Sequence, residues 1–218
     1  PRRKMLVSSE GGGGIFPAIY GTAVMTLVMT LAVMPVGVLT AIYLHEYAPP
    51  RSRLAALVRV AVTNLAGVPS IVFGLFGLGF FIQFVGRHLD RALSEPGTLH
   101  YGQPALIWAS LTLAVLTLPV VIVSTEEALR AVPRDHRDAS LALGATRSQT
   151  LARVVLPGAL PGILTGGILA VARGAGEVAP ILFTGVAYFL PDLPTSGFSQ
   201  FMHLGYHTYV LATQSPDV

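Results

Sequence analysis

Ile15–Leu44 reads IFPAIYGTAVMTLVMTLAVMPVGVLTAIYL, a long run without a charged side chain. A helix needs roughly 20 apolar residues to cross the hydrocarbon core of a bilayer. This run exceeds that length, and it decides the fold class. We expect the protein to be all-α, a polytopic bundle of membrane helices.

Three further apolar runs follow along the chain. They are Leu54–Val85, with Arg59 inside, Pro104–Val123, without charge, and Pro157–Leu190, with Arg173 and Glu177 inside. The alternative interpretation is a set of helices buried in a large soluble core. The composition favours membrane spans, because charged residues make up only 11% of the 218 residues, against about 25% in soluble domains.

Several classes of function are excluded by composition. The chain has no cysteine, which excludes a disulfide scaffold and a thiolate metal site. It has 13 arginines but a single lysine, Lys4. A Walker A loop requires a lysine within a glycine-rich turn, and Lys4 has no such context. We therefore expect no ATP site and no cofactor in this chain.

The positive residues between the runs predict the orientation. The segments 45–59 and 124–156 carry eight arginines on one side, and the other side carries five Lys or Arg residues. Cytoplasmic loops are the richer in Lys and Arg, so we expect 45–59 and 124–156 to be cytoplasmic. Residues 1–14 are then the end of an outer loop, and 15–218 form the membrane domain.

Two of the apolar runs are broken by glycine and proline. Asn64–Ser70 reads NLAGVPS within the second run, and Arg173–Pro180 reads RGAGEVAP within the fourth. Proline removes a helix hydrogen bond and glycine loosens the backbone, and paired broken helices point to a transport site near the membrane midplane. We therefore place Asn64 and Ser70 in the candidate substrate pathway. Ordinary proline kinks are the alternative.

Arg173 and Glu177 are four residues apart, about one helical turn. A charge at the bilayer centre costs on the order of 2.5–3.5 kcal/mol on insertion scales, so such residues pair or line a polar path. One interpretation is an ion pair that holds helices together. The other is an anion path, in which the Arg173 guanidinium binds a tetrahedral oxyanion. Glu177 would then accept a hydrogen bond from an anion that still carries a proton, which favours hydrogenphosphate over sulfate.

The segment 124–156 is far more polar than its flanks, and we expect a helix, a turn and a second helix. Ser124 with Glu127 and Thr146 with Gln149 have the spacing of capping boxes, and Gly144 suits a helix stop. The apolar residues of the first helix, Leu143 among them, share a small face. Such a helix could dock into a groove on another protein or lie on the lipid surface.

At this point the sequence resembles a known family. Asp138-Ala139-Ser140, three residues, Gly144, nine residues and then Val154-Val155-Leu156-Pro157 is similar to the EAA loop of ABC importer permeases. That loop reads E-A-A, three residues, G, nine residues, I-x-L-P, so the spacing matches throughout and three residue types differ. In the family this loop seats in the ATPase subunit, which implies a coupling role for Asp138, Ala139, Ser140, Leu143 and Gly144.

Further stretches resemble the permeases of phosphate importers. Asn64–Gly77 is similar to these permeases in general, whereas Ala172–Thr184 and Glu126–Pro133 resemble the A-type subunit, PstA. The resemblance implies the type I, MetI-like permease fold in the bacterial inner membrane. Such subunits usually have six spans, so we expect the first and last spans to be absent from this sequence.

The implied function is that of a transport subunit without its own enzymatic site. It would form half of the pathway for inorganic phosphate, with an ATP-binding subunit, a homologous second permease and a phosphate-binding protein as partners. A permease for molybdate, sulfate or phosphonate, a passive anion channel, and a membrane enzyme using Glu177 are the alternatives. His203 and His207 have the i, i+4 spacing of metal ligands, but no third ligand is evident and we expect no metal site.

Overall fold

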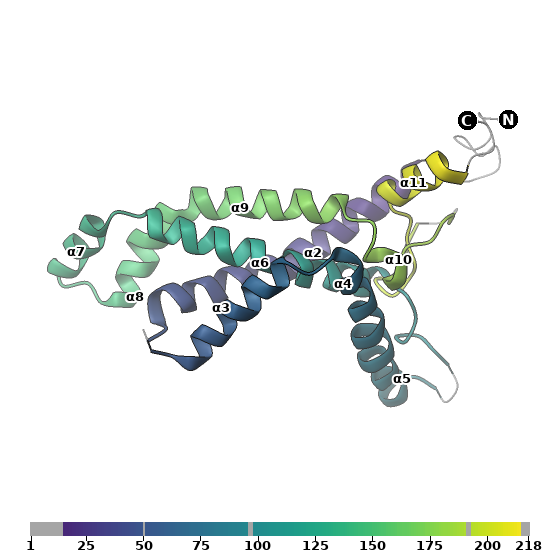
Figure 1. Ribbon diagram of the computed structural model, residues 1–218, viewed down its shortest axis with the longest axis horizontal. Helices are drawn as coiled ribbons and strands as arrows, with labels where there is room; N and C mark the ends of the chain where they lie inside the picture. The colour runs from purple at the N-terminus through teal and green to yellow at the C-terminus, as the bar shows by residue number, and fades with distance from the viewer. Residues whose placement is uncertain (1–14, 50, 96–97, 191–192, 215–218) are drawn as a thin grey trace. The chain divides into compact units, whose positions relative to one another are not determined.

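The computed structural model describes residues 15–49, 51–95, 98–190 and 193–214. Residues 1–14, where we expect an outer loop, lie outside the described residues. The described part is helical and contains no strand, with a single isolated bridge between Val186 and Phe201. The elements (Figure 1) are α2 (Phe16–Ile42), η1 (Tyr43–Tyr47), α3 (Arg53–Ala66), α4 (Ser70–Phe76), η2 (Gly77–Gly86), α5 (Arg87–Leu93), α6 (Leu106–Ala131), α7 (Arg134–Ala142), α8 (Arg147–Thr150), η3 (Leu151–Val155), α9 (Leu156–Gly176), α10 (Ile181–Thr184) and α11 (Leu204–Gln214), where η denotes π-helix.

The chain divides into two compact units, which are described separately. Unit 1 consists of the described residues within Pro1–Leu31, Val68–Leu116 and Arg173–Val218. Unit 2 consists of those within Ala32–Gly67 and Thr117–Ala172. The long helices α2, α6 and α9 contribute residues to both units.

Four helical stretches are long and apolar enough to cross a membrane, as the sequence predicts. They are Phe16–Tyr47, Ser70–Leu93, Leu106–Ala131 and Arg147–Gly176. The first and third agree with the predicted runs apart from their ends. The other two differ from the prediction in ways that matter for the site.

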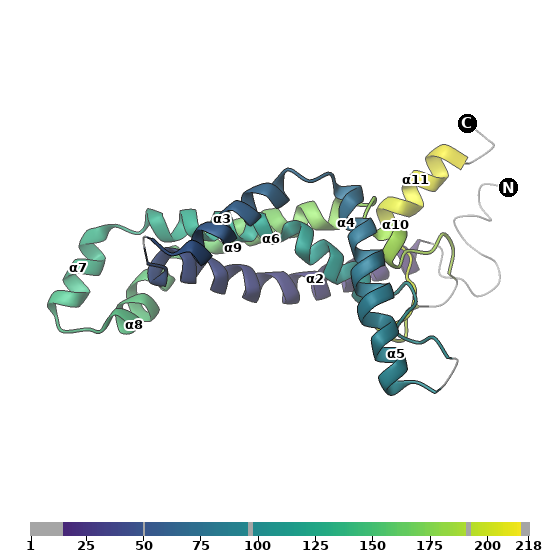
Figure 2. The same ribbon diagram turned by 60° about the horizontal axis from the view of Figure 1, so that its bottom comes forward.

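The second span is shorter than predicted and begins later. The predicted break at Asn64–Ser70 is present, because α3 ends at Ala66 and helix resumes only at Ser70. Pro69, just before Ser70, has φ −57° and ψ 138°, an extended conformation. Proline suits this position because the first helical N–H groups have no intrahelical acceptor. The span is therefore α4, η2 and α5, which follow one another as one helical column (Figure 2).

The fourth span is shifted toward the amino end of the predicted run. Helix begins at Arg147 and passes through Leu156-Pro157, which the sequence predicts as the entry to the span. The π-helical turn η3 precedes Pro157, whose nitrogen has no hydrogen for the helical ladder. The helix ends at Gly176, and only the four residues of α10 are helical between there and Leu190.

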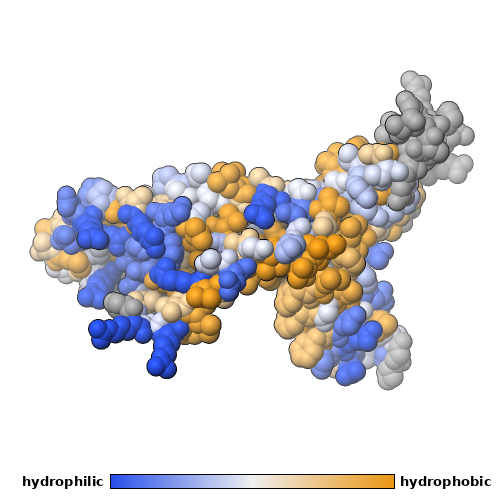
Figure 3. All heavy atoms as spheres, in the orientation of Figure 1, coloured by the Kyte–Doolittle hydropathy of each residue, from blue (hydrophilic) through white to orange (hydrophobic). Residues whose placement is uncertain are grey.

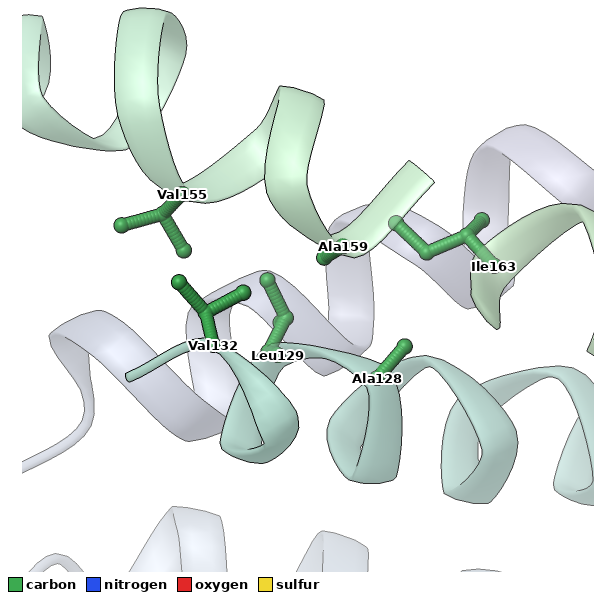
Figure 4. Packing of buried hydrophobic residues seen from close by; sticks show 6 residues of the cluster. All are labelled: Ala128, Leu129, Val132, Val155, Ala159 and Ile163. Atoms are coloured by element: carbon green, nitrogen blue, oxygen red, sulfur yellow. The ribbon is translucent and has the colours of Figure 1, made fainter. Parts of the chain in front are cut away.

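In unit 2, α6 packs against η3 and α9 through a cluster of buried aliphatic side chains. Figure 4 shows two sets of residues facing each other. One set is Ala128 and Leu129 on α6 with Val132 just after it, and the other is Val155 on η3 with Ala159 and Ile163 on α9. A Cβ atom at Gly162 would lie 2.7 Å from the Cβ of Ala128, so the backbones approach closely there. Because lipid tails are as apolar as these side chains, close packing and not the hydrophobic effect holds such helices together.

In unit 1, hydrogen bonds with the side chains of Asp90 and Trp108 hold the loop before α6. The Asp90 carboxylate accepts backbone hydrogen bonds from His100 (2.9 Å), Tyr101 (2.7 Å) and Gly102 (2.7 Å). Trp108 Nε1 donates to the Tyr101 carbonyl at 2.8 Å. The loop is thus held at residues 100–102, because these contacts satisfy backbone groups there directly.

Candidate functional site

The docking segment, defined here as residues 134–150, comprises α7, a turn and α8. It follows the third candidate span and leads into the fourth. Only its last element, α8, belongs to a span, because the fourth span starts there. None of the nine residues of α7 is buried. Figure 3 shows hydrophilic side chains gathered over the α7 and α8 end of unit 2. The predicted helix, turn and second helix are therefore present.

The first half of the predicted polar segment is not a separate helix. Ser124 and Glu127 lie inside α6, which continues to Ala131, so they form no capping box. Ser124 Oγ instead donates to the Val121 carbonyl at 3.2 Å. The predicted helix start at Ser124 was wrong. The polar residues there mark the end of the apolar run, whereas the helix itself continues to Ala131.

Gly144 ends α7 as the sequence predicts. It has φ +87°, the only φ in the left-handed range among the described residues, and a side chain there would be strained. Its N–H donates to the Leu141 carbonyl at 2.9 Å, and the Ala145 N–H donates to the Ser140 carbonyl at 3.2 Å. This pair of bonds is the Schellman motif, which satisfies carbonyls that the helix leaves free.

The second helix of the docking segment begins with the predicted capping box. Thr146 Oγ1 accepts from the Gln149 N–H at 3.3 Å, and Gln149 Oε1 accepts from the Thr146 N–H at 2.9 Å. The hydroxyls of Ser140 and Thr150 lie 2.9 Å apart and join α7 to α8. The turn is therefore fixed on both sides of Gly144.

An arginine that sequence reasoning missed anchors the segment to the rest of unit 2. Arg137 donates to Glu46 Oε1 at 2.6 Å and to the Leu129 carbonyl, in the last turns of α6, at 2.7 Å. Both charged side chains are 20% exposed. Glu46 is the first charge after the first apolar run, but 91 positions separate it from Arg137, so the pairing leaves no local signal in one sequence.

The predicted coupling residues are accessible on the surface of the segment. Asp138, Ala139, Leu143 and Gly144 are exposed, and Ser140 is half-buried. Leu143 is 90% exposed, an unusual position for a large apolar side chain. The arrangement offers a rigid surface with an apolar contact point to a partner protein.

The structure brings Arg173 and Glu177 together. Arg173 Nε lies 3.7 Å from Glu177 Oε1, and the side chains are 53% and 23% exposed. Arg173 is in the last turn of α9, and Glu177 follows the helix end at Gly176. The pair therefore marks the end of the fourth span rather than its middle, and both groups keep hydrogen-bonding capacity for another partner.

The other two predicted pathway residues flank the break between α3 and α4. Ser70 is the first residue of α4 in unit 1, half-buried. It makes no hydrogen bond with Arg173 or Glu177 in the described part of the chain. Asn64 is exposed in the last turn of α3 in unit 2, where its carbonyl accepts from the Gly67 N–H at 3.1 Å.

A second ion pair, also missed from the sequence, lies in unit 2. Arg59 donates to Glu126 Oε2 at 2.9 Å and to the Leu44 carbonyl at 2.9 Å. Glu126 is 9% exposed. The pair joins α3 to α6, and the Leu44 contact satisfies a carbonyl within η1, so Arg59 holds three elements together.

In unit 1, His203 directly precedes α11 and His207 lies in its first turn. His203 is 1% exposed, and burial lowers the pKa of its imidazole. The described residues contain no group of three or more His, Cys, Asp or Glu side chains placed to hold a metal ion. The histidine spacing therefore has no third ligand among them.

Comparison with known proteins identifies relatives over most of the chain. Residues 33–212 match the family described as binding-protein-dependent transport system inner membrane component. The probable ABC transporter permease protein YqgI of Bacillus subtilis is 37% identical over 79% of this chain and 53% of its own length. The phosphate transport system permease protein PstA 1 of Mycobacterium tuberculosis is 41% identical over 81% of this chain and 53% of its own length. The chain thus spans about half the length of these relatives.

The fold also matches a solved structure. A chain from inward-facing conformations of the MetNI methionine ABC transporter superposes with a TM-score of 0.57 and 24% identity, covering 81% of this chain and 72% of that one. The predicted MetI-like permease fold is therefore confirmed. With four spans and this fold, the protein is a multi-pass membrane protein.

Proposed function

The chain belongs to the family of inner membrane components of binding-protein-dependent transport systems, and from this premise we propose that it is a permease subunit of an ATP-driven importer of inorganic phosphate. In this role it forms half of the translocation pathway and binds a separate ATPase subunit. The chain itself supplies no ATP site and no cofactor, and ATP is used by the partner.

The observation that carries the proposal is the docking segment. None of the residues of the short helix α7 is buried, so the helix contributes no side chain to the core of its own chain. The Schellman turn at Gly144 and the capping box at Thr146 nevertheless fix its shape. A surface that is both rigid and uncovered is suited to a partner protein, because little conformational entropy is lost on binding.

The contacts within unit 2 supply a route from that surface to the membrane helices. Arg137 ties α7 to η1 and to the end of α6. Ser140 ties α7 to α8, which continues into η3 and α9. Since α6 and α9 are packed together through the aliphatic cluster of Figure 4, a displacement of the docking segment moves both helices.

Phosphate is proposed as the substrate from the relatives and from the chemistry of the ion pair. Relatives with 36–41% identity are phosphate transport system permeases. The Arg173 guanidinium can bind an oxyanion with two parallel hydrogen bonds, and Glu177 can accept a hydrogen bond from hydrogenphosphate but would repel sulfate. We also propose that Asn64 and Ser70 belong to the substrate pathway.

The partners follow from this assignment. They are an ATP-binding subunit on the docking segment, a homologous second permease that completes the pathway, and a phosphate-binding protein on the outer side. The location is the bacterial inner membrane, with the docking segment in the cytoplasm. A permease for molybdate, sulfate or phosphonate is the alternative that the uptake experiment below separates.

Uptake of radiolabelled phosphate into proteoliposomes that hold the complete complex tests the proposal. Gly144→Ala places a side chain at positive φ, which costs roughly 1–2 kcal/mol and should reduce ATP-dependent uptake about tenfold. Gly197→Ala is the matched control, because Gly197 is also in open space but its φ lies outside the left-handed range. Uptake of another oxyanion in preference to phosphate would contradict phosphate as the substrate. Unaltered uptake in Gly144→Ala would contradict the proposed role of the docking segment in binding the ATPase subunit.

A further inference from the structure

A cavity in unit 2, beside the start of α7, has a lining rich in arginine. Its volume is about 440 Å³, and it is lined by His45, Arg130, Val132, Arg134 and Arg137. Small-molecule sites have volumes of roughly 300–1,000 Å³, so the cavity has room for a ligand group. Arg173 and Glu177 belong to unit 1. The cavity is therefore not part of the candidate substrate site.

Two of the arginines keep donors for a ligand. Arg130 lies 3.5 Å from Glu126 Oε2, an oxygen that Arg59 already contacts at 2.9 Å, and the Arg130 side chain is 59% exposed. Arg134 is exposed and makes no ion pair or hydrogen bond within the described part of the chain. A guanidinium has five N–H donors, so most of the donors of Arg130 and Arg134 are free.

The lining includes no carboxylate from the residues that the structure describes. Glu46 is held by Arg137 at 2.6 Å and lies 3.7 Å from His45 Nε2. Asp135 and Asp138 of α7 are exposed and lie outside the lining. The cavity is therefore cationic, and the ligand class that it attracts is an anion.

The type of cation narrows the anion. A guanidinium presents a planar fork of donors that matches the oxygens of a phosphate at two points. Two such forks at one cavity suit a tetrahedral group with several oxygens, whereas one fork already satisfies a carboxylate. Arg134 is the first residue of α7, whose amino end has no side-chain cap, and the helix dipole adds positive potential there.

The ends of two candidate spans place the cavity near the membrane surface. The first span ends at Tyr47 and the third at Ala131. His45 and Arg130 line the cavity within two residues of these ends. The headgroup region begins where the hydrocarbon core ends, so the cavity lies at the depth of lipid phosphates. Basic pockets between membrane helices are known sites for anionic headgroups.

We propose that this cavity binds a phosphate group, with Arg130 and Arg134 as its donors, and that an anionic membrane lipid supplies the group. Inorganic phosphate offers the same chemistry from the aqueous side. A side chain of the ATPase subunit fits less well, because Leu143 lies at the other end of α7, about 13 Å further along the helix. The site requires neither transport nor ATP, so it does not depend on the proposed function.

Native mass spectrometry tests the proposal by counting the lipids that remain bound to the full-length protein. The protein is taken from vesicles of phosphatidylglycerol and phosphatidylcholine, alone and in the complete complex. The test variant is Arg130→Gln with Arg134→Gln; both side chains are exposed, so the fold should persist. Arg53→Gln is the matched control, at an exposed arginine of α3 that does not line the cavity.

The original protein and Arg53→Gln should both retain phosphatidylglycerol in preference to phosphatidylcholine, whose choline cation is repelled by the arginines. The double variant should retain about tenfold less phosphatidylglycerol, because it lacks two donors of charge-assisted hydrogen bonds. The preference should persist in the complete complex, since the ATPase subunit is not expected to fill the cavity.

Calorimetric titration with inorganic phosphate separates the two sources of the group. It is carried out in an Arg173→Ala background, which removes the candidate substrate site. Phosphate binding that the double variant loses, with equal lipid retention in all variants, would keep the site and assign it to the free anion. Three results would overturn the proposal: no loss in either measurement, an equal loss in Arg53→Gln, or exclusion of phosphatidylglycerol from the complete complex.

Discussion

The docking segment and the Arg173–Glu177 pair are both polar interruptions of apolar helices, but they are held in different ways. The docking segment is fixed by two helix caps, a hydroxyl contact and the double hydrogen bond of Arg137. The Arg173–Glu177 pair is joined by one contact of 3.7 Å between partly exposed groups. Residues fixed by many bonds can present a constant surface, whereas residues with spare hydrogen-bonding capacity can change partners.

This difference indicates a division of roles within one chain. A surface for a protein partner gains affinity from being preorganised. A transport site must bind and then release its substrate, so its groups should be able to exchange one hydrogen-bonding partner for another. If the roles are divided in this way, substitutions in the two regions should affect phosphate uptake, selectivity and complex assembly differently.

The largest effect is expected at the loosely held pair. Arg173→Ala removes the guanidinium of the candidate site and should abolish phosphate uptake. Complex assembly should be unaffected, because an exposed ion pair contributes little to stability. Uptake and size-exclusion profiles of the same preparations provide the two measurements.

Arg173→Lys is the matched control for this substitution. It keeps the positive charge but loses the planar fork that binds an oxyanion at two points, so uptake should remain strongly reduced. A complex that fails to assemble in Arg173→Ala would contradict the pathway role and favour a purely structural ion pair.

A smaller effect, on selectivity, is expected from Glu177→Gln. The carboxylate repels a fully ionised anion, and the neutral amide does not, so discrimination between phosphate and sulfate should weaken. Competition of unlabelled sulfate against labelled phosphate uptake measures the change. Selectivity equal to that of the original protein would show that Glu177 does not face the substrate.

The smallest effect is expected at the capping box of the rigid region. Thr146→Ala removes the oxygen that accepts from the Gln149 N–H, a loss of about 1 kcal/mol. Since the turn is also held by the Gly144 motif, we expect uptake to fall by a factor of about five at most. Thr146→Ser retains the cap and should transport normally; equal losses in both variants would argue against the cap as the cause.

Features set by local backbone chemistry were predictable from the sequence. The positive φ of Gly144 and the Thr146–Gln149 box depend on residues within a few positions of each other. The apolar runs identified four spans, because length and hydropathy decide insertion. The fold class and the docking segment followed from these signals.

Features set by long-range contacts or by helix continuity were not predictable. The Arg137–Glu46 and Arg59–Glu126 contacts join residues 91 and 67 positions apart. The predicted helix ends were wrong where polar residues such as Ser124 continue an apolar helix. The break at Asn64–Ser70 was predicted, but the later start of the second span, at Ser70, was not. Hydropathy indicates whether a residue lies in lipid or in water. It does not indicate where a helix begins or ends.

The most direct test of the account concerns Leu143, the apolar residue that the docking segment exposes. Leu143→Asp places a charge where a partner's groove should receive a side chain, and Leu99→Asp, at a 54% exposed leucine outside the spans, is the control. Binding of the separately purified ATP-binding subunit to the full-length permease pair is measured by surface plasmon resonance. The account predicts that Leu143→Asp abolishes binding while Leu99→Asp leaves the affinity unchanged. Full affinity in Leu143→Asp would contradict the claim that this segment holds the ATPase.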